Sequence, residues 1–101
     1  MASRLDLQAF LENLLGSRNV YFQPPASVKM NYPAIVYSRK NIVNEHANDG
    51  VYIQNNCYEV IVIDKNPDSE YPLKLARLPL CSFDRHYEAE NLNHDVFTLY
   101  F

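Results

Sequence analysis

The sequence predicts an α+β domain, with a mostly antiparallel sheet of four to five strands and two helices packed on it, in the order α-β-β-β-α-β-β. Three observations support this prediction. They are a helical apolar period near the N-terminus, an uninterrupted β-branched and aromatic run in the middle, and alternating apolar and polar residues near the C-terminus. Because 101 residues is the size of one domain, we expect a single domain over residues 1–101.

The N-terminal stretch predicts the first helix. Four large apolar residues recur at positions i, i+3, i+4 and i+7: Leu7, Phe10, Leu11 and Leu14. Ser3 and Asp6 have the form of a capping box at the start of this helix, and Gly16 stands where a left-handed residue ends one. An apolar stripe of this size needs burial, so we expect the helix to pack on the sheet.

The longest strand signal is the run YIQNNCYEVIVID, residues 52–64. Its C-terminal half is apolar on both faces, which predicts a central strand covered on both sides. Fully extended, the run would reach roughly 43 Å at ~3.3 Å per residue, whereas a domain of this size has a radius of gyration of about 13 Å. We therefore expect either a bulge near Asn55 and Asn56 or an arm that projects beyond the domain.

Two further strands precede this run. A short one over 19–23 ends at a Pro-Pro pair, and a clearer one over 34–39 begins directly after Pro33. The sequence Asn-Asp-Gly at 48–50 is a strong turn signal. It predicts a hairpin that joins the strand over 34–39 to the long run.

The C-terminal third predicts a second helix and two more strands. The helix is short, with Ser69 as its N-cap and Pro79 at its end. Alternation over 81–88 and again over 95–101 predicts two strands, with residues 90–93 as the connector.

Composition and charge exclude several classes of protein. A net charge of −3 argues against a nucleic-acid-binding face, which is usually basic. Two cysteines are too few for a disulfide scaffold. No apolar run approaches the ~20 residues of a membrane span, and charges interrupt the region where a signal peptide needs an apolar core. We expect a soluble protein made in the cytoplasm, with no membrane partner.

The side chains that carry chemistry do not form a known motif. His46, His86 and His94 lie in different elements without ligand spacing, although the last two could face each other across the C-terminal hairpin. A hydrolase interpretation would use His86 as base, oriented by Asp84 or Glu88. These three residues have strand period two, which is typical of one exposed row. We expect no catalytic residue, no metal site and no cofactor.

The aromatic content is high, with eight Tyr, five Phe and no Trp. Tyrosine is enriched at protein–protein interfaces because its ring is apolar and its hydroxyl is polar. Tyrosine is also a good strand former, so a Tyr-rich core explains the same composition. Composition alone leaves both interpretations open.

Three stretches that span most of the chain carry a family resemblance: NVYFQPPASVKMNYPAIVYS, YEVIVIDKNPDSEYP and LPLCSFDRHYEAENLNHDVFTLYF. They resemble a small-protein family of tail-completion or tail-terminator proteins from the head–tail region of long-tailed bacteriophages. The resemblance implies a virion protein of the neck. It would be one subunit of a homo-oligomeric ring, typically a hexamer, that caps the tail tube, joins it to the head connector and leaves a channel through which DNA passes without sequence-specific binding.

Two groups of residues are candidate subunit or lumen contacts under this interpretation. The hairpin tip contributes Asn44, Glu45, His46, Asn48 and Asp49, and the last strand contributes Phe97, Tyr100 and Phe101. A head–tail joining or head-closure protein is an alternative within the same class. An adaptor domain without a ring and a small hydrolase are alternatives from other classes.

Overall fold

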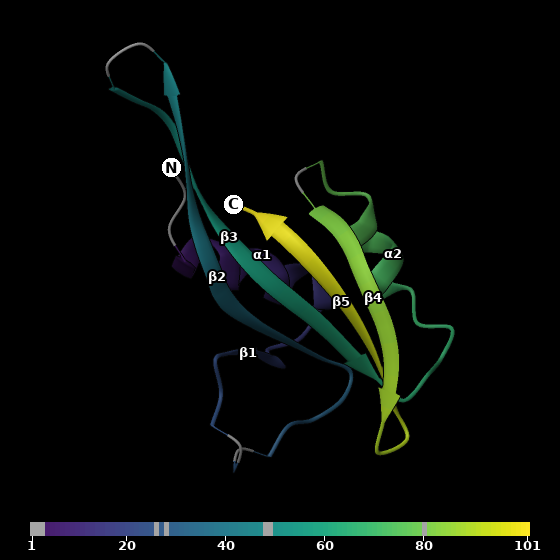
Figure 1. Cartoon of the computed structure of the whole chain (residues 1–101). Coiled ribbons are helices and arrows are strands. Elements are labelled where there is room, and N and C mark those ends of the chain that lie inside the picture. The colour runs from purple at the N-terminus through teal and green to yellow at the C-terminus, as the bar shows by residue number, and fades with distance from the viewer. Residues whose placement is uncertain (1–3, 26, 28, 48–49, 80) are drawn as a thin grey trace.

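The computed structural model describes residues 4–25, 27, 29–47, 50–79 and 81–101, with the backbone alone over 41–47 and 50–56. Figure 1 shows its two helices and five strands. In chain order they are α1 (Arg4–Leu15), β1 (Val20–Phe22), β2 (Ala34–Ala47), β3 (Gly50–Asp64), α2 (Tyr71–Ala76), β4 (Cys81–Ala89) and β5 (Leu92–Tyr100).

The five strands form one sheet in the order β1-β2-β3-β5-β4, which differs from their order along the chain. The α+β class is therefore confirmed, and β3 is the central strand as predicted. The sheet is mixed rather than mostly antiparallel, which corrects the expectation, because β1 pairs parallel with β2. A parallel neighbour needs a connection that returns the chain to the same end. Residues 23–33 make that return, and strand periodicity alone carries no sign of it.

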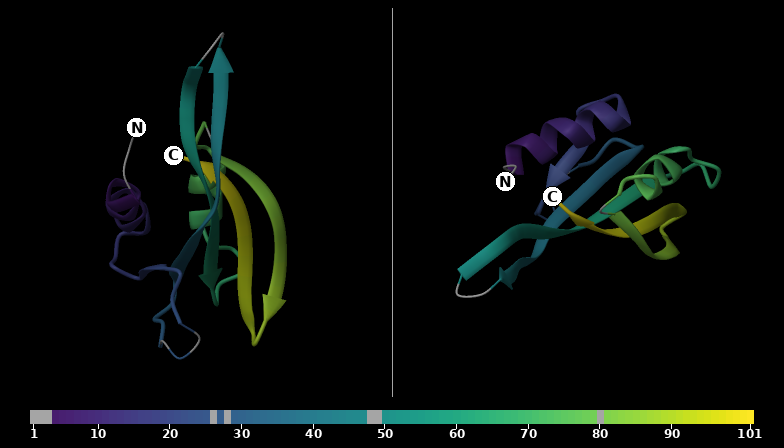
Figure 2. Two further views of the ribbon diagram at one scale, coloured as in Figure 1. Left: turned by 60° about the vertical axis from the view of Figure 1, so that its left-hand side comes forward. Right: turned by 90° about the horizontal axis from the view of Figure 1, so that it is seen from above.

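Both helices lie on one face of the sheet, as the view from above in Figure 2 shows. Strand residues that face them belong to one buried cluster with the helices: Val20, Ile35, Tyr37, Tyr58, Val60, Val62, Phe97 and Leu99. Among the described residues, no helix covers the other face, which corrects the expected cover on both sides of β3. Val96 and Ile63 are still buried on that face, at 0% and 6% exposed.

The first helix packs through a stripe slightly different from the predicted one. Leu7, Leu11 and Leu15 are buried in the core, whereas Phe10 lies at the edge of the stripe and is exposed. Gly16 has φ of 78° and its amide donates to the carbonyl of Glu12 at 2.9 Å, so the predicted helix end is confirmed. Ser3 of the predicted capping box lies outside the described residues.

A polar bridge fixes α1 to the sheet. The Tyr37 hydroxyl donates to Gln8 Oε1 at 2.5 Å, and Gln8 Nε2 donates to the Val20 carbonyl at 3.0 Å. The Arg4 guanidinium donates to the Tyr37 hydroxyl at 3.2 Å. Burial raises the pKa of Tyr37, with the nearby Arg4 acting in the opposite direction. Gln8 therefore joins one helix to two strands.

The second helix begins later than expected. Its N-cap is Glu70, and Ser69, the predicted cap, lies one residue earlier and accepts the Tyr71 amide at 3.4 Å. Pro72 occupies the first turn, where its missing N–H costs nothing. Leu75 is fully buried and attaches this short helix to the core.

The last two strands form a tight hairpin. Glu90 and Asn91 have φ of 53° and 64°, and Ala89 pairs with Leu92. Two consecutive residues with positive φ are the signature of a two-residue turn that matches strand twist. The predicted connector over 90–93 is therefore too long, and β5 begins directly after the turn.

Beyond the body of the sheet, β2 and β3 continue as a two-stranded ribbon, visible at the top of Figure 1. The molecule measures 50 × 24 × 22 Å because of this ribbon, which we call the arm and define as residues 41–47 and 50–56. An arm rather than a compact strand was one of the two expected outcomes. Bulges occur between Arg39 and Asn41 and between Glu45 and His46, not near Asn55 and Asn56 as expected.

Candidate assembly surface

The arm is the part of β2 and β3 that extends beyond the ends of the neighbouring strands. Its strands pair with each other from Asn41 opposite Cys57 to Ala47 opposite Gly50. The neighbouring strands stop before the arm begins: β5 ends opposite Cys57, and β1 ends opposite Tyr37. Over the described part of the arm, each strand therefore has one strand partner and one free edge.

The predicted tip residues belong to the outer part of this arm. Asn44, Glu45 and His46 belong to β2, and the structure describes only their backbone. Asn48 and Asp49 also lie outside the described residues. Their contacts with a neighbouring subunit or a lumen remain predictions.

An apolar groove of about 290 Å³ lies at the base of the arm. It is lined by Phe10 from α1, by the segment after α2 and by the end of β5, and its residues are Phe10, Leu78, Pro79, Leu99, Tyr100 and Phe101. The rings of Phe10 and Phe101 lie 6.2 Å apart between centroids. Because Tyr100 pairs with Cys57, the groove adjoins the point at which the arm leaves the sheet.

The three aromatic residues predicted as an interface separate into two groups. Tyr100 and Phe101 line the apolar groove. Phe97 is only 1% exposed and packs edge to face against Phe83, with ring centroids 5.5 Å apart. Its side chain belongs to the core of the subunit. Alternation separates Tyr100 from the other two, but it does not separate Phe97 from Phe101, because their burial depends on what α1 and the segment after α2 cover.

Both cysteines are free thiols. Cys57 is buried opposite Tyr100, and Cys81 lies beside the apolar groove with Pro79 and Tyr100. Burial raises the pKa of the Cys81 thiol. A thiol kept protonated by burial is a poor nucleophile, which argues against a nucleophilic role for Cys81.

His86 has a partner that the sequence analysis missed. Its Nδ1 lies 2.8 Å from Oδ1 of Asp95, the residue directly opposite on β5. The expected partners were Asp84 or Glu88, but Asp84 instead pairs with Arg85 at 2.7 Å. A bulge between Phe83 and Arg85 shifts the row that the alternation predicted. Only the cross-strand register reveals the His86–Asp95 pair.

A cavity of about 410 Å³ brings Ser69 to the same surface as His86 and Asp95. A hydrolytic serine must donate its hydroxyl proton to the base at about 2.6–3.2 Å. Among the described residues the Ser69 hydroxyl accepts the amide of Tyr71 and forms no hydrogen bond with His86. His86 is exposed, so water competes for its ring nitrogens. The cluster lacks the geometry of a catalytic triad.

His94 lies on the opposite face of the hairpin from His86. It is opposite Tyr87, and their rings stack with centroids 4.6 Å apart at 11°. His86 and His94 therefore cannot share a ligand, which corrects the idea that they face each other. In the part of the chain that the structure describes, no group of three or more His, Cys, Asp or Glu side chains is placed to hold a metal ion.

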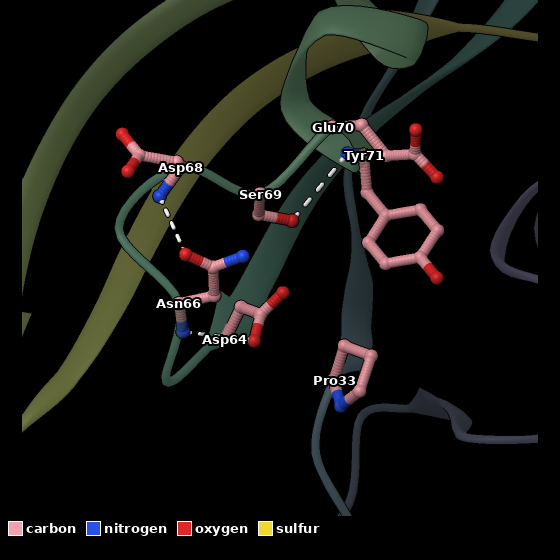
Figure 3. Close-up of a pocket in the computed structure, with 7 residues that line it drawn as sticks. All are labelled: Pro33, Asp64, Asn66, Asp68, Ser69, Glu70 and Tyr71. Atoms are coloured by element: carbon pink, nitrogen blue, oxygen red, sulfur yellow. Dashed lines mark hydrogen bonds between the residues drawn. The ribbon is translucent and has the colours of Figure 1, made fainter.

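Figure 3 shows a second cavity of about 410 Å³ between the end of β3 and the start of α2. The side chains of Asp64, Asn66 and Ser69 accept backbone amides in local turns. The Asn66 amide donates to Asp64 at 3.1 Å, and the Asp68 amide donates to Asn66 at 3.0 Å. These bonds order the loop that enters α2.

Comparisons with known proteins give no further assignment. No protein-family model, no curated protein and no solved structure matches the chain. Among the described helices, none has the length and apolar character needed to cross a membrane.

Proposed function

We propose that this chain is a non-enzymatic structural subunit of the neck of a long-tailed bacteriophage. Copies of it form a ring, typically a hexamer, that acts as tail terminator or tail-completion protein. The ring caps the tail tube, meets the head connector on its other side and leaves a channel for DNA. The observation that carries this proposal is the arm, which extends the molecule to 50 Å along its longest axis, compared with 24 and 22 Å along the other two.

An arm of this kind favours an assembly role on energetic grounds. An isolated two-stranded hairpin is at best marginally stable in water, because it buries little apolar surface for the backbone entropy that it loses. The body gains nothing from strands that extend beyond its helices and outer strands. A neighbouring subunit that packs on the arm supplies the missing contacts.

The charge of the chain suits a DNA channel. The net charge is −3, and the arm and its tip contain Glu45 and Asp49 but no Lys or Arg between residues 41 and 56. A protein surface that holds DNA tightly neutralises phosphates with basic side chains. A ring whose inner surface is formed by such arms lets DNA pass without sequence-specific binding.

The mass of the purified protein in solution tests this proposal. We expect multi-angle light scattering to give a mass several times the 11.8 kDa of one chain, and negative-stain images to show rings with a central opening. Purified tail-tube protein should shift these rings onto the ends of tubes. A chain that stays monomeric at high concentration and with tube protein present contradicts the ring and favours an adaptor domain.

A head–tail joining or head-closure protein also forms a ring in the neck. The same images separate these possibilities from a tail terminator, since a terminator binds the ends of tubes in the absence of heads. Binding to head connectors alone would assign the ring to the other side of the neck.

A further inference from the structure

We propose that the free edge of β3 over residues 50–56 is an acceptor site for the arm of a second copy of this chain. The donor is the free edge of β2 over residues 41–47 of the neighbour, and the apolar groove receives the base of the donor strand. This inference rests on the proposed ring and specifies which surfaces close it.

The acceptor site is the backbone edge of β3 beyond the end of β5. On that side β3 is paired with β5 as far as Cys57 opposite Tyr100, and then β5 ends while β3 continues to Gly50. The C-terminus of β5 is marked in Figure 1 at the base of the arm. A strand placed in line with β5 would find a backbone edge of about 23 Å, at ~3.3 Å per residue.

The outer edges of the body, on β4 and β1, are protected against pairing with other chains, whereas the edge of β3 in the arm is not. The outer edge of β4 has a bulge after Phe83 and carries Asp84, Arg85 and Glu88. The other outer strand, β1, is only three residues long. Bulges, charges and short strands are the devices by which proteins prevent strands from pairing with other chains. The stretch GVYIQNN, residues 50–56, has no charge and no proline.

A second copy is the occupant that uses both free edges of the arm. If β3 of one copy paired with β3 of another about a two-fold axis, the β2 edges of both would stay free. Head-to-tail pairing of β3 with β2 of the next copy uses each edge once. When that arrangement closes into a ring, no edge of any arm remains unpaired.

The apolar groove fits the base of the donor strand. When the arms lie along the ring axis, rotation keeps them all pointing the same way, so β2 of the neighbour runs antiparallel to β3, as it does within one arm. The residues at the base of the neighbour's arm then arrive near the level at which β5 ends. In sequence these include Ile42 and Val43, the two consecutive large apolar residues of the donor stretch. Tyr100 and Phe101 in the groove offer an apolar surface there.

Disulfide trapping tests the pairing directly. One batch carries Gln54→Cys on β3, and four other batches carry a single cysteine on β2 at position 42, 43, 44 or 45. Each β2 batch is mixed with the Gln54→Cys batch, allowed to exchange subunits and oxidised mildly. The wild-type chain under the same oxidation controls for Cys57 and Cys81, which are free.

We expect cross-linked pairs in at least one mixture and in none of the single batches. A cross-link in the Gln54→Cys batch alone would show two-fold pairing of like edges and overturn the inference. Rings that form normally but give no cross-link in any mixture would also overturn it, while the proposed ring function would stand. A wild-type chain without rings would remove both proposals.

Two matched tyrosine variants test the groove. Tyr100 and Tyr87 have similar exposed fractions, 37% and 38%, but only Tyr100 lines the groove. We expect Tyr100→Ser to weaken assembly at least tenfold, measured as the concentration at which rings dissociate, and Tyr87→Ser to leave that concentration unchanged. Equal effects of the two substitutions would exclude the groove from the interface.

Discussion

The body and the arm of this protein share two strands, β2 and β3, and they differ in what surrounds those strands. In the body, β2 and β3 lie between β1 and β5 under two helices, and their helix-facing side chains are buried. In the arm, the same strands pair only with each other among the described residues. The sequence changes at the same place, from Val-Ile-Val-Ile in β3 of the body to Gln-Asn-Asn in the arm.

This difference separates two roles along one pair of strands. Burial of apolar surface supplies most of the stability of a small domain. The body therefore determines the free energy of unfolding. The arm lies outside the buried cluster, and under the proposed function its backbone edges pair with a neighbouring copy. Substitutions in the body should change stability, and substitutions in the arm should change assembly.

The largest expected effect on stability is in the core of the body. Leu11 is 0% exposed under α1, so Leu11→Ala should lower the free energy of unfolding by about 2–5 kcal/mol, through lost burial and the cavity left behind. Leu5, on the same helix but 66% exposed, is the control. Leu5→Ala should change the free energy by less than ~0.5 kcal/mol. Urea denaturation measures both, and equal losses would contradict the assigned helix face.

Two buried tyrosines give the next effect, because only one has a hydrogen-bonded hydroxyl. Tyr37→Phe leaves Gln8 without its donor and should cost about 1–3 kcal/mol. The hydroxyl of Tyr58 is buried and has no partner among the described residues. Tyr58→Phe should therefore be neutral or stabilising. A loss at Tyr58 as large as at Tyr37 would reveal a partner for its hydroxyl.

The same polar bridge predicts a response to alkaline pH. Burial raises the pKa of Tyr37 in the folded chain, so the unfolded chain releases this proton first as pH rises. The contribution is fully present below the unfolded pKa of about 10 and is lost as pH rises through the folded pKa. Stability measured at pH 9 and pH 11 should fall more steeply for the wild-type chain than for Tyr37→Phe. Identical changes of stability with pH in the two chains would show that groups other than Tyr37 cause the loss of stability at alkaline pH.

Much of this body could be predicted from the sequence, because local periods report local structure. The period of Leu7 and Leu11 located α1, and the β-branched run located β3 at the centre of the sheet. Pairing could not be predicted in the same way. The parallel direction of β1 and the pairing of His86 with Asp95 depend on contacts between distant residues, which leave no local pattern.

The candidate assembly surface was predicted only in part, for the same physical reason. Excess strand length indicated the arm, since a strand longer than the body has to leave it. Tyr100 and Phe97 are three positions apart in β5, so alternation places them on opposite faces, but it does not say which face the helices cover. Which of them is exposed depends on the position of the helices and of the segment after α2. That arrangement is a property of the whole fold.

The smallest expected effect on the free energy of unfolding comes from a change in the arm. It contrasts with the large loss expected for Leu11→Ala. Replacement of residues 44–49 by an Asn-Gly turn shortens the arm and keeps a turn that suits two antiparallel strands. The buried core lies outside this segment, so the free energy of unfolding should change by less than ~0.5 kcal/mol. Assembly should be lost, because the shortened edges no longer span the acceptor site.

Light scattering and urea denaturation on the same sample measure both properties of the shortened chain. Rings of normal mass from this variant would remove the arm from the interface and leave it without a role. A large loss in the free energy of unfolding would instead show that the arm contributes to folding, which would contradict the distinction between body and arm. Loss of rings with unchanged unfolding is the result that only a dedicated assembly arm produces.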